Sequence, residues 1–183
     1  LDIQLYEGWQ EYIDKDAPDI YPEELRYDID ALNDVIYADV NLAVNLAALA
    51  GTQEEYEYYY DLVFDRLDWL EERLSTRRYL MGDTITSPDI RLFVTLTRFD
   101  LVFYQKYLLN KKRLVDYPNL WNYAKDLFSN PAFGGNTDFN SMRLRFYYVD
   151  HTPFADMPRL MPKGPDDSRW LEPNDRAEKF SKK

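Results

Sequence analysis

The chain has 183 residues, of which 33 are acidic, 22 are basic and none is cysteine, so its formal net charge is −11. Such a charge repels phosphate backbones and anionic lipid headgroups, which makes nucleic acid and membrane surfaces poor partners. Without cysteine the chain holds no disulfide, no thiolate metal ligand and no cysteine nucleophile. Because no run of about 18 apolar residues is present, we expect no membrane span and a soluble, intracellular protein, in the cytoplasm or in an organelle.

The first long helix is expected from about Pro22 to Gly51. Pro22 suits a first turn because its missing N–H would be unpaired there, and Gly51 can adopt the left-handed conformation that ends a helix. Between them, apolar residues recur every three or four positions and predict one buried stripe, formed by Leu25, Ile29, Leu32, Ile36 and Val40.

A second long helix follows at once. Thr52 and Glu55 have the spacing of a capping box, in which each side chain accepts a hydrogen bond from the backbone of the other residue. An apolar and aromatic stripe then continues from Tyr56 to Leu74. Since only about two residues join the two helices, we predict that they pack as an antiparallel pair.

The stretch "MGDTITSPDIRLF", residues 81–93, predicts the start of a third helix. Thr86 is expected to cap this helix and Asp89 to accept a hydrogen bond from the Thr86 N–H, while Ile85 staples the incoming chain onto the first turns. The helix itself, roughly 87–108, is apolar on more than one side, which is typical of a central helix.

Shorter helices are expected beyond it, one from Pro118 and one over about 136–148, capped by Asn136 or Thr137. From 151 to 183 the chain is rich in proline and charge, which indicates an extended tail that lies over the body. The predicted fold class is therefore all-α, a helical bundle with an extended C-terminal tail.

Side chains that carry chemistry are sparse. His151 is the only histidine, and the acidic runs at 14–19 and 54–57 are best explained as solvated surface, so we predict no metal site. Tyr147 and Tyr148 fall at helical positions, where they either pack in the core or line a pocket with their hydroxyl groups. Helical spacing leaves that choice open.

Four stretches together resemble a known family: "DIYPEELRYDIDALNDVIYADVN", "LEERLSTRRYLMGDTITSPDIRLFVTLTRFDLVFY", "LVDYPNLW" and "RFYYVDH". They are similar to the C-terminal helical domain of glutathione transferases, in particular the omega-like glutathionyl-hydroquinone reductases of the Xi class. The resemblance implies an all-α domain over 20–150, preceded over 1–19 by the last helix of a thioredoxin-like domain and a linker, and followed by the tail at 151–183. It also implies that the box of Thr86 and Asp89 is a folding determinant of the central helix.

In that family, an N-terminal thioredoxin-like domain supplies the catalytic cysteine and the glutathione pocket. The helical domain supplies a wall of the hydroquinone pocket and the dimer interface. The resemblance therefore implies glutathione as the cofactor, no metal, and no catalytic residue within this chain. It assigns substrate-binding roles to Asn41, Asn45, Phe103, Tyr147 and Tyr148.

Two of these positions depart from the family pattern. The family's Val-Asn-Asn-Gly-Val-Tyr is "VNLAVN" here, so Leu42 replaces an asparagine and Asn45 replaces a tyrosine. Its Arg-Phe-Asp-x-Val-Tyr is "RFDLVF", with Phe103 in place of the tyrosine. A buried phenol that binds a substrate hydroxyl is worth about 1–3 kcal/mol, so the predicted pocket differs from the family's where the substrate binds.

Two functional hypotheses follow. In the first, the chain is the helical domain of a glutathione-dependent reductase with a divergent substrate pocket, and it forms a homodimer through this domain. In the second, it is a non-catalytic structural subunit that keeps the glutathione transferase fold and docks onto other proteins of a larger assembly. The aromatic content of 16% suits the protein interface that the second hypothesis needs.

Overall fold

The computed structural model describes residues 2–13, 17–149 and 160–181. Within these ranges the regular elements are all helical, and the β pairing is limited to one isolated bridge between Tyr79 and Gly82. The longer helices are α2 (Arg26–Ile36), α3 (Ala43–Leu49), α4 (Gln53–Ser75), α5 (Ser87–Arg98) and α7 (Pro118–Ser129). The shorter ones are α1 (Asp2–Gly8), α6 (Tyr104–Lys106), α8 (Pro131–Gly134), α9 (Phe139–Arg143) and α10 (Arg176–Lys179). Three segments are π-helical, η3 (Tyr37–Leu42), η4 (Phe99–Phe103) and η6 (Leu144–Val149), and four are 3₁₀ turns, η1 (Gln10–Tyr12), η2 (Glu23–Leu25), η5 (Leu114–Asp116) and η7 (Asp167–Leu171).

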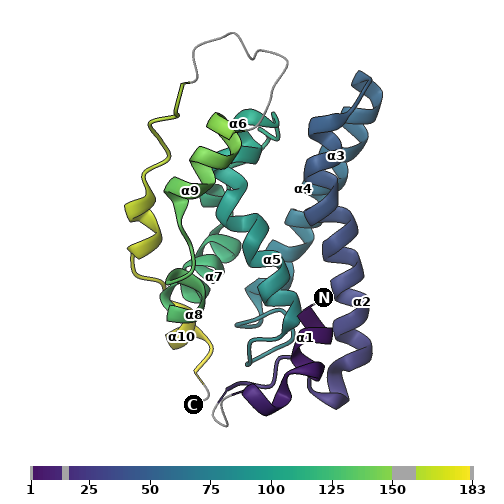
Figure 1. The fold of residues 1–183 in the computed structure, drawn as a ribbon, viewed down its shortest axis with the longest axis vertical. Coiled ribbons are helices and arrows are strands. Elements are labelled where there is room, and N and C mark those ends of the chain that lie inside the picture. Colours follow the sequence, from purple (N-terminus) through teal and green to yellow (C-terminus); the bar gives the residue numbers. More distant parts are fainter. Residues whose placement is uncertain (1, 14–16, 150–159, 182–183) are drawn as a thin grey trace.

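The predicted antiparallel pair is confirmed. α2, η3 and α3 follow one another as one long helix, and the chain turns back through residues 50–52 into α4, which lies alongside (Figure 1). Seven members of the two stripes meet in the core and are at most 1% exposed: Ile29, Ile36, Val40, Val63, Leu67, Leu70 and Leu74. Leu32 is 6% exposed, whereas Leu25, predicted in the same buried stripe, lies in η2 and is only partly buried. Burial of one such side chain contributes about 1.5–3 kcal/mol, so this seam is a major part of the fold's stability.

The start of α4 differs from the predicted capping box in one bond. The Thr52 hydroxyl accepts the Glu55 N–H at 3.1 Å, as predicted. Glu55 Oε2, however, accepts the Gly51 N–H at 2.9 Å instead of the Thr52 N–H. The glutamate side chain is long enough to reach past Thr52 to the preceding amide, and Thr52 remains the residue that caps the helix.

The capping box at the start of α5 is confirmed. Asp89 Oδ2 accepts the Thr86 N–H at 2.8 Å, and the Ser87 N–H reaches the Ile20 carbonyl at 2.9 Å. Thr86, Ser87 and Asp89 are all fully buried. This helix start is therefore inside the molecule, where water cannot replace a lost hydrogen bond.

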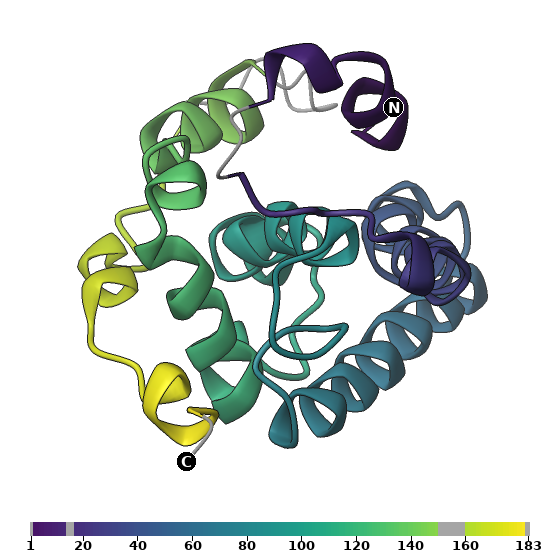
Figure 2. The same cartoon turned by 90° about the horizontal axis from the view of Figure 1, so that it is seen from below.

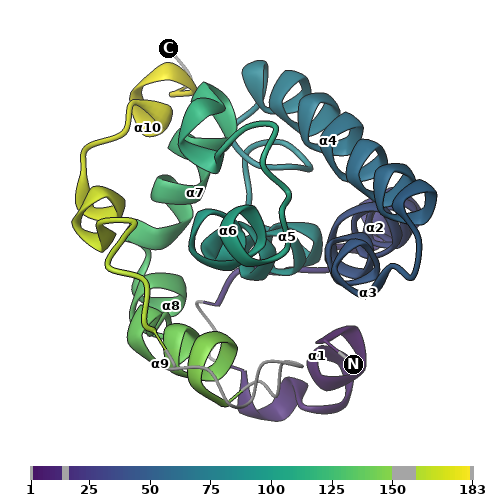
Figure 3. The same cartoon turned by 90° about the horizontal axis from the view of Figure 1, so that it is seen from above.

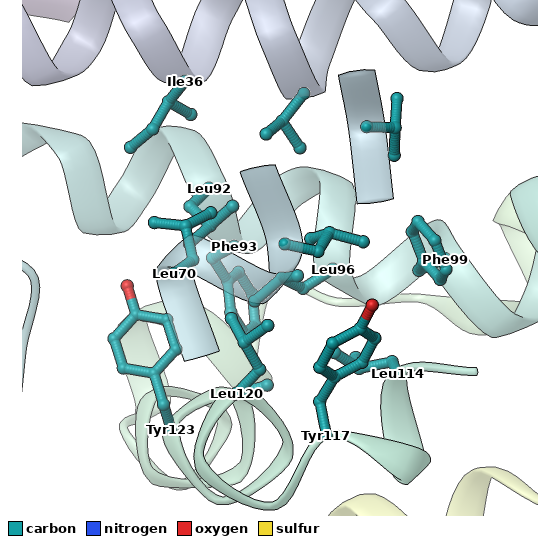
Figure 4. Close-up of a cluster of buried hydrophobic side chains, with 14 of the residues drawn as sticks. Ile36, Leu70, Leu92, Phe93, Leu96, Phe99, Leu114, Tyr117, Leu120 and Tyr123 are labelled. Atoms are coloured by element: carbon teal, nitrogen blue, oxygen red, sulfur yellow. The ribbon is translucent and has the colours of Figure 1, made fainter. Parts of the chain in front are cut away.

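α5 occupies the centre of the bundle, between α7 and the pair formed by α2 and α4 (Figure 3). Figure 4 shows its apolar side chains packed between those of the surrounding helices, with Leu92 and Leu96 near Ile36 and Leu70 on one side and Leu120 of α7 on the other. A helix that is apolar on several sides must be enclosed in this way.

The helix predicted over about 87–108 is continuous in the structure as α5, the π segment η4 and the single turn α6, and it ends at Lys106. One local expectation for the second half is wrong. The cap expected for the helix over about 136–148, Asn136 or Thr137, is replaced by Asp138, whose Oδ1 accepts the Ser141 N–H at 3.0 Å. Thr137 donates its hydroxyl backward to the Phe133 carbonyl and so closes the previous turn instead.

Beyond the undescribed residues 150–159, the chain runs along the outside of α9 and α7 (Figures 1 and 2). It forms η7 and then α10, and both pack on α7. Arg143 pairs with Asp167 at 2.6 Å, and the Lys125 ammonium reaches the Pro173 carbonyl at 2.8 Å. The part of the predicted tail that the structure describes is therefore held on the body, whereas His151 lies outside the described residues.

Candidate functional site

Four of the five residues assigned to a substrate pocket lie in π-helical segments. Asn41 is in η3, Phe103 is in η4, and Tyr147 and Tyr148 are in η6. A π segment inserts one extra residue into the helical hydrogen-bond ladder, and such segments are frequent at functional sites. The fifth residue, Asn45, follows η3 in the first turn of α3.

Asn41 and Asn45 form one group beside α5. Asn41 Nδ2 donates to the Arg91 carbonyl at 3.1 Å and to the Thr95 hydroxyl. Its Oδ1 is buried and finds no hydrogen-bond donor among the residues that the structure describes. Asn45 is exposed, and its Nδ2 donates to the Asn41 carbonyl at 2.8 Å. In the first group, the Asn41 side-chain amide is therefore held in place, and its Oδ1 is available to accept a hydrogen bond.

Phe103 and Tyr147 belong to a second group at the other end of the central helix. Phe103 is only 4% exposed and packs edge-on against Phe146, with ring centroids 6.4 Å apart. The Tyr147 hydroxyl donates to the Leu101 carbonyl at 2.8 Å. Tyr148, in contrast, is 51% exposed. The second group therefore combines an apolar wall, a fixed phenol and an exposed one.

The electrostatics of the second group keep Tyr147 neutral. Burial raises the pKa of Tyr147 above its ordinary value, so the phenol stays protonated at neutral pH. The Lys106 ammonium lies 5.8 Å from the centre of the Tyr147 ring and donates to the Phe146 carbonyl. Lys106 is not among the five residues to which the resemblance assigns substrate binding. Its signal in the sequence is its position three residues after Phe103, within one helical turn.

Comparison with known proteins decides the family. The profile described as "Glutathione S-transferase, C-terminal domain" matches residues 53–126. The chain is 39% identical over 147 residues to the glutathionyl-hydroquinone reductase PcpF of Sphingobium chlorophenolicum, which covers 80% of this chain and 46% of that protein. It also matches the glutathione-bound structure of YqjG, a glutathione transferase homologue from Escherichia coli K-12, with a TM-score of 0.86 and 32% identity over 97% of this chain and 57% of that one. The chain has the C-terminal helical domain of glutathione S-transferases.

The family assignment covers the helical domain. A third relative, the glutathione S-transferase Xi from Phanerochaete chrysosporium, has a TM-score of 0.79 and 35% identity over 87% of this chain and 54% of that one. The chain spans about half the length of the curated relatives it matches. It is glutathionyl-hydroquinone reductase-like in both sequence and structure, as the four quoted stretches predicted.

In this glutathione S-transferase domain, the two groups are linked through the central helix. Asn41 contacts Thr95 of α5, and Tyr147 contacts Leu101 of η4. These contact points are six residues apart, or about 9 Å along a helix axis. Figure 3 shows α3 and α9, the helices beside the two groups, on different sides of α5.

The groups at hand can bind and orient a ligand. Amide and phenol oxygens accept hydrogen bonds from hydroxyl groups, and Phe103 offers an apolar surface. Among the described residues, no three potential ligands from histidine, cysteine, aspartate and glutamate come close enough to hold a metal ion. None of the described helices is both long and apolar enough to cross a bilayer.

Proposed function

We propose that this chain is the helical half of a glutathione-dependent oxidoreductase that acts on glutathionyl-hydroquinones. We further propose that its substrate pocket is lined by Asn41 and Asn45 on one side of α5 and by Phe103, Tyr147 and Tyr148 on another; these five residues are called the wall below. The relationship to PcpF, a glutathionyl-hydroquinone reductase, supports this activity. The observation that carries the proposal for the wall is the placement of four of these residues in three separate π segments.

Each wall residue has a role that its contacts support. The Tyr147 proton is used on the Leu101 carbonyl, which leaves its oxygen to accept a hydrogen bond from a hydroquinone hydroxyl. Asn41 Oδ1 is a second buried acceptor that needs a donor. Phe103 packs against the aromatic ring of the substrate without a polar contact, where the family pattern has a tyrosine.

In this proposal, the catalytic thiolate and the glutathione-binding groups lie outside the helical domain. The chain has no cysteine, so in this proposal the attacking thiolate belongs to a thioredoxin-like domain whose last helix lies within residues 1–19. By the family resemblance, the glutathione pocket also belongs to that thioredoxin-like domain, so we assign no glutathione contact to this chain. Exposed apolar side chains on the N-terminal elements, Leu5, Trp9 and Tyr12, offer a contact surface for that preceding domain.

We further propose an intracellular homodimer formed through the helical domain. Tyr27 on α2 is 86% exposed and is of the residue type that protein interfaces favour. Other protein subunits are the alternative occupants of such a surface.

The test is glutathione-dependent reduction of a glutathionyl-hydroquinone by the native protein, with its intact mass and the peptide sequence before Leu1 determined on the same sample. We expect turnover, a mass well above 21.9 kDa and a cysteine in the added sequence. Tyr147→Phe should raise KM, whereas Tyr58→Phe, a matched change on the surface of α4, should leave KM unchanged. A protein that co-purifies with other chains and shows no turnover would instead be the non-catalytic subunit.

A further inference from the structure

Helix α9 leads directly into η6, the π segment that carries Tyr147 and Tyr148 of the wall. Arg143 is the last residue of α9 and lies four residues, about one helical turn, before Tyr147. The orientation of α9 therefore determines where the two tyrosines lie. Contacts that fix α9 also position this part of the wall.

The 3₁₀ turn η7, in the C-terminal segment, contacts α9 at both of its ends. Asp167 accepts two hydrogen bonds from Arg143, the last residue of α9, at 2.6 and 2.7 Å. Trp170 packs on Phe139, the first residue of α9, with ring centroids 5.5 Å apart. Figure 1 shows the C-terminal segment running along the outside of α9. One element thus holds this short helix along its whole length.

The spacing of these residues explains why both contacts form together. Asp167 and Trp170 are three residues apart, and residues at that spacing lie on the same side of a 3₁₀ helix. Phe139 and Arg143 are four residues apart, and residues at that spacing share one face of an α-helix. Two matching pairs therefore face each other, one joined by charge and the other by aromatic packing.

Both contacts are well anchored. The Arg143 side chain is only 12% exposed, and it also donates to the Pro165 carbonyl at 3.2 Å. An arginine and a carboxylate joined by two parallel hydrogen bonds fix each other's direction as well as their distance. Trp170 is buried, and its ring also packs on Trp121 of α7 with centroids 4.9 Å apart. η7 is therefore fixed to α7 while it holds α9.

Arg143 also lies close enough to Tyr147 to act on its phenol. Burial raises the pKa of Tyr147, and the positive charge of Arg143 opposes that rise. The Tyr147 hydroxyl donates to the Leu101 carbonyl at 2.8 Å, a bond that requires η6 to keep its place against η4. A shift of α9 would lengthen this bond and turn the phenol oxygen away from the position that the proposed function gives it.

We propose that η7 is a positioning element of the substrate wall, in which Asp167 and Trp170 act through α9 to hold Tyr147 in place. This inference rests on the proposed function for the role of Tyr147. It adds that the C-terminal segment sets the affinity for the substrate without touching it, so Asp167 and Trp170 are positioning residues.

The first test requires no substrate. Amide hydrogen exchange of the native protein is followed by mass spectrometry in peptides that cover 139–149, α4 and 160–171. Asp167→Ala should make residues 139–149 exchange about ten-fold faster, as loss of a hydrogen-bonded charged pair would, and leave α4 unchanged. Glu172→Ala, which removes an exposed carboxylate paired with Arg169 in the same segment, should leave 139–149 and α4 unchanged. Faster exchange confined to 160–171 would overturn the proposal, because η7 would then hold only itself.

A double variant shows whether the pair itself carries the effect. Arg143→Met keeps much of the aliphatic stem and removes the guanidinium. Combined with Asp167→Ala, it should exchange at 139–149 no faster than either single variant, since both break the same contact. Effects that multiply would mean that the two residues act separately, which contradicts the proposal. Asp167→Asn, which keeps the shape of the side chain, repeats both measurements if Asp167→Ala does not fold.

The second test is the reaction with a glutathionyl-hydroquinone. We expect Asp167→Ala to raise KM about five-fold with little change in kcat, as loss of binding shared by the ground state and the transition state does. In a Tyr147→Phe background the same change should raise KM less, because the hydroxyl that it positions is already absent. An unchanged KM in an active protein would overturn this inference and leave the proposed function intact. If the parent protein shows no turnover, the proposed function fails, and exchange at 139–149 alone decides whether η7 positions η6.

Discussion

The Tyr123 hydroxyl donates to Asp89 Oδ1 across 2.7 Å and joins α7 to the first turn of α5 inside the core. The same oxygen accepts the Leu80 N–H at 2.9 Å, and Oδ2 accepts the N–H and the hydroxyl of Thr86. One fully buried carboxylate thus connects the loop before α5, the start of α5 and α7. A capping residue that is usually local holds three parts of this fold together.

Removal of this carboxylate should destabilise the protein strongly. Asp89→Ala leaves four buried donors without an acceptor, and we expect a loss of about 3–5 kcal/mol in the free energy of unfolding. The measurement is urea unfolding followed by far-UV circular dichroism. Asp138→Ala is the matched control, because Asp138 caps α9 at the surface, where water can replace it. Equal losses in the two variants would show that Asp89 acts only as a local cap.

The bond between the two side chains can be measured on its own. Tyr123→Phe keeps the ring and removes one donor, so we expect a loss of about 1–2 kcal/mol in unfolding free energy. A double-mutant cycle combines this change with Asp89→Asn. The loss in unfolding free energy of the double variant should be about 1 kcal/mol smaller than the sum of the two single losses, since both changes break the same bond. Strict additivity would mean that the hydroxyl contributes to stability through some other contact.

Much of the architecture could be predicted from the sequence because its determinants are local. Stripes at three- and four-residue spacing fix which faces of the long helices are buried, and the two-residue turn leaves them only an antiparallel arrangement. The capping box of Thr86 and Asp89 can likewise be predicted from the sequence, since both residues lie within one helical turn. The hydrogen bond between Asp89 and Tyr123, in contrast, joins residues that are 34 apart in the sequence, so no local pattern predicts it.

The candidate site was harder to predict. The extra residue in a π segment leaves apolar spacing almost unchanged, so η3, η4 and η6 look like ordinary helix in the sequence. The family resemblance assigned all five residues of the proposed wall, whereas helical spacing left Tyr147 and Tyr148 between the core and a pocket. Their contacts, such as that of Asn41 with Thr95 or Tyr147 with Leu101, join residues 54 and 46 apart. The composition of the tail indicates that it lies over the body, but not that Trp170 is buried or that η7 and α10 pack on α7.

Arg176 is the clearest example of a residue whose role only the structure reveals. Its guanidinium is buried, 1% exposed, and it donates to the carbonyls of Leu74, Arg77 and Arg78 at the end of α4 and just beyond. These carbonyls lie at the negative end of the α4 dipole, which favours a cation. Arg176→Ala should lower the free energy of unfolding by about 3 kcal/mol and open the C-terminal segment to proteolysis.

The comparison for Arg176 is Arg169→Ala, which removes a partly exposed arginine from the same segment. We expect a change within about 0.5 kcal/mol and unchanged proteolysis. For Arg176→Lys we expect a loss in unfolding free energy between those of Arg169→Ala and Arg176→Ala. A lysine ammonium cannot reach all the carbonyls that the planar guanidinium spans. If Arg176→Ala is cut no faster than the parent protein, the segment is held chiefly by its other contacts.

Alkaline pH should weaken the fold through Tyr79. Burial raises the pKa of Tyr79 from 10.0 to about 12. Above pH 10 the unfolded chain releases this proton while the native state retains it, so the stability that the raised pKa provides is complete below pH 10 and is lost as the pH rises toward 12. Unfolding free energies at pH 9 to 12 should therefore fall less steeply in Tyr79→Phe than in the parent. Exposed Tyr58→Phe should leave the slope unchanged.

The two departures from the family pattern should respond differently to reversal. Phe103→Tyr places a hydroxyl in an aromatic cluster among Phe99, Tyr107 and Phe146, and an unpaired hydroxyl there costs about 1–3 kcal/mol. Asn45→Tyr changes an exposed side chain, so its unfolding free energy should stay within about 0.5 kcal/mol of the parent's. Urea unfolding of both variants tests this. A Phe103→Tyr variant as stable as the parent would mean that the new hydroxyl finds a partner, and that this part of the wall still accommodates the family's phenol.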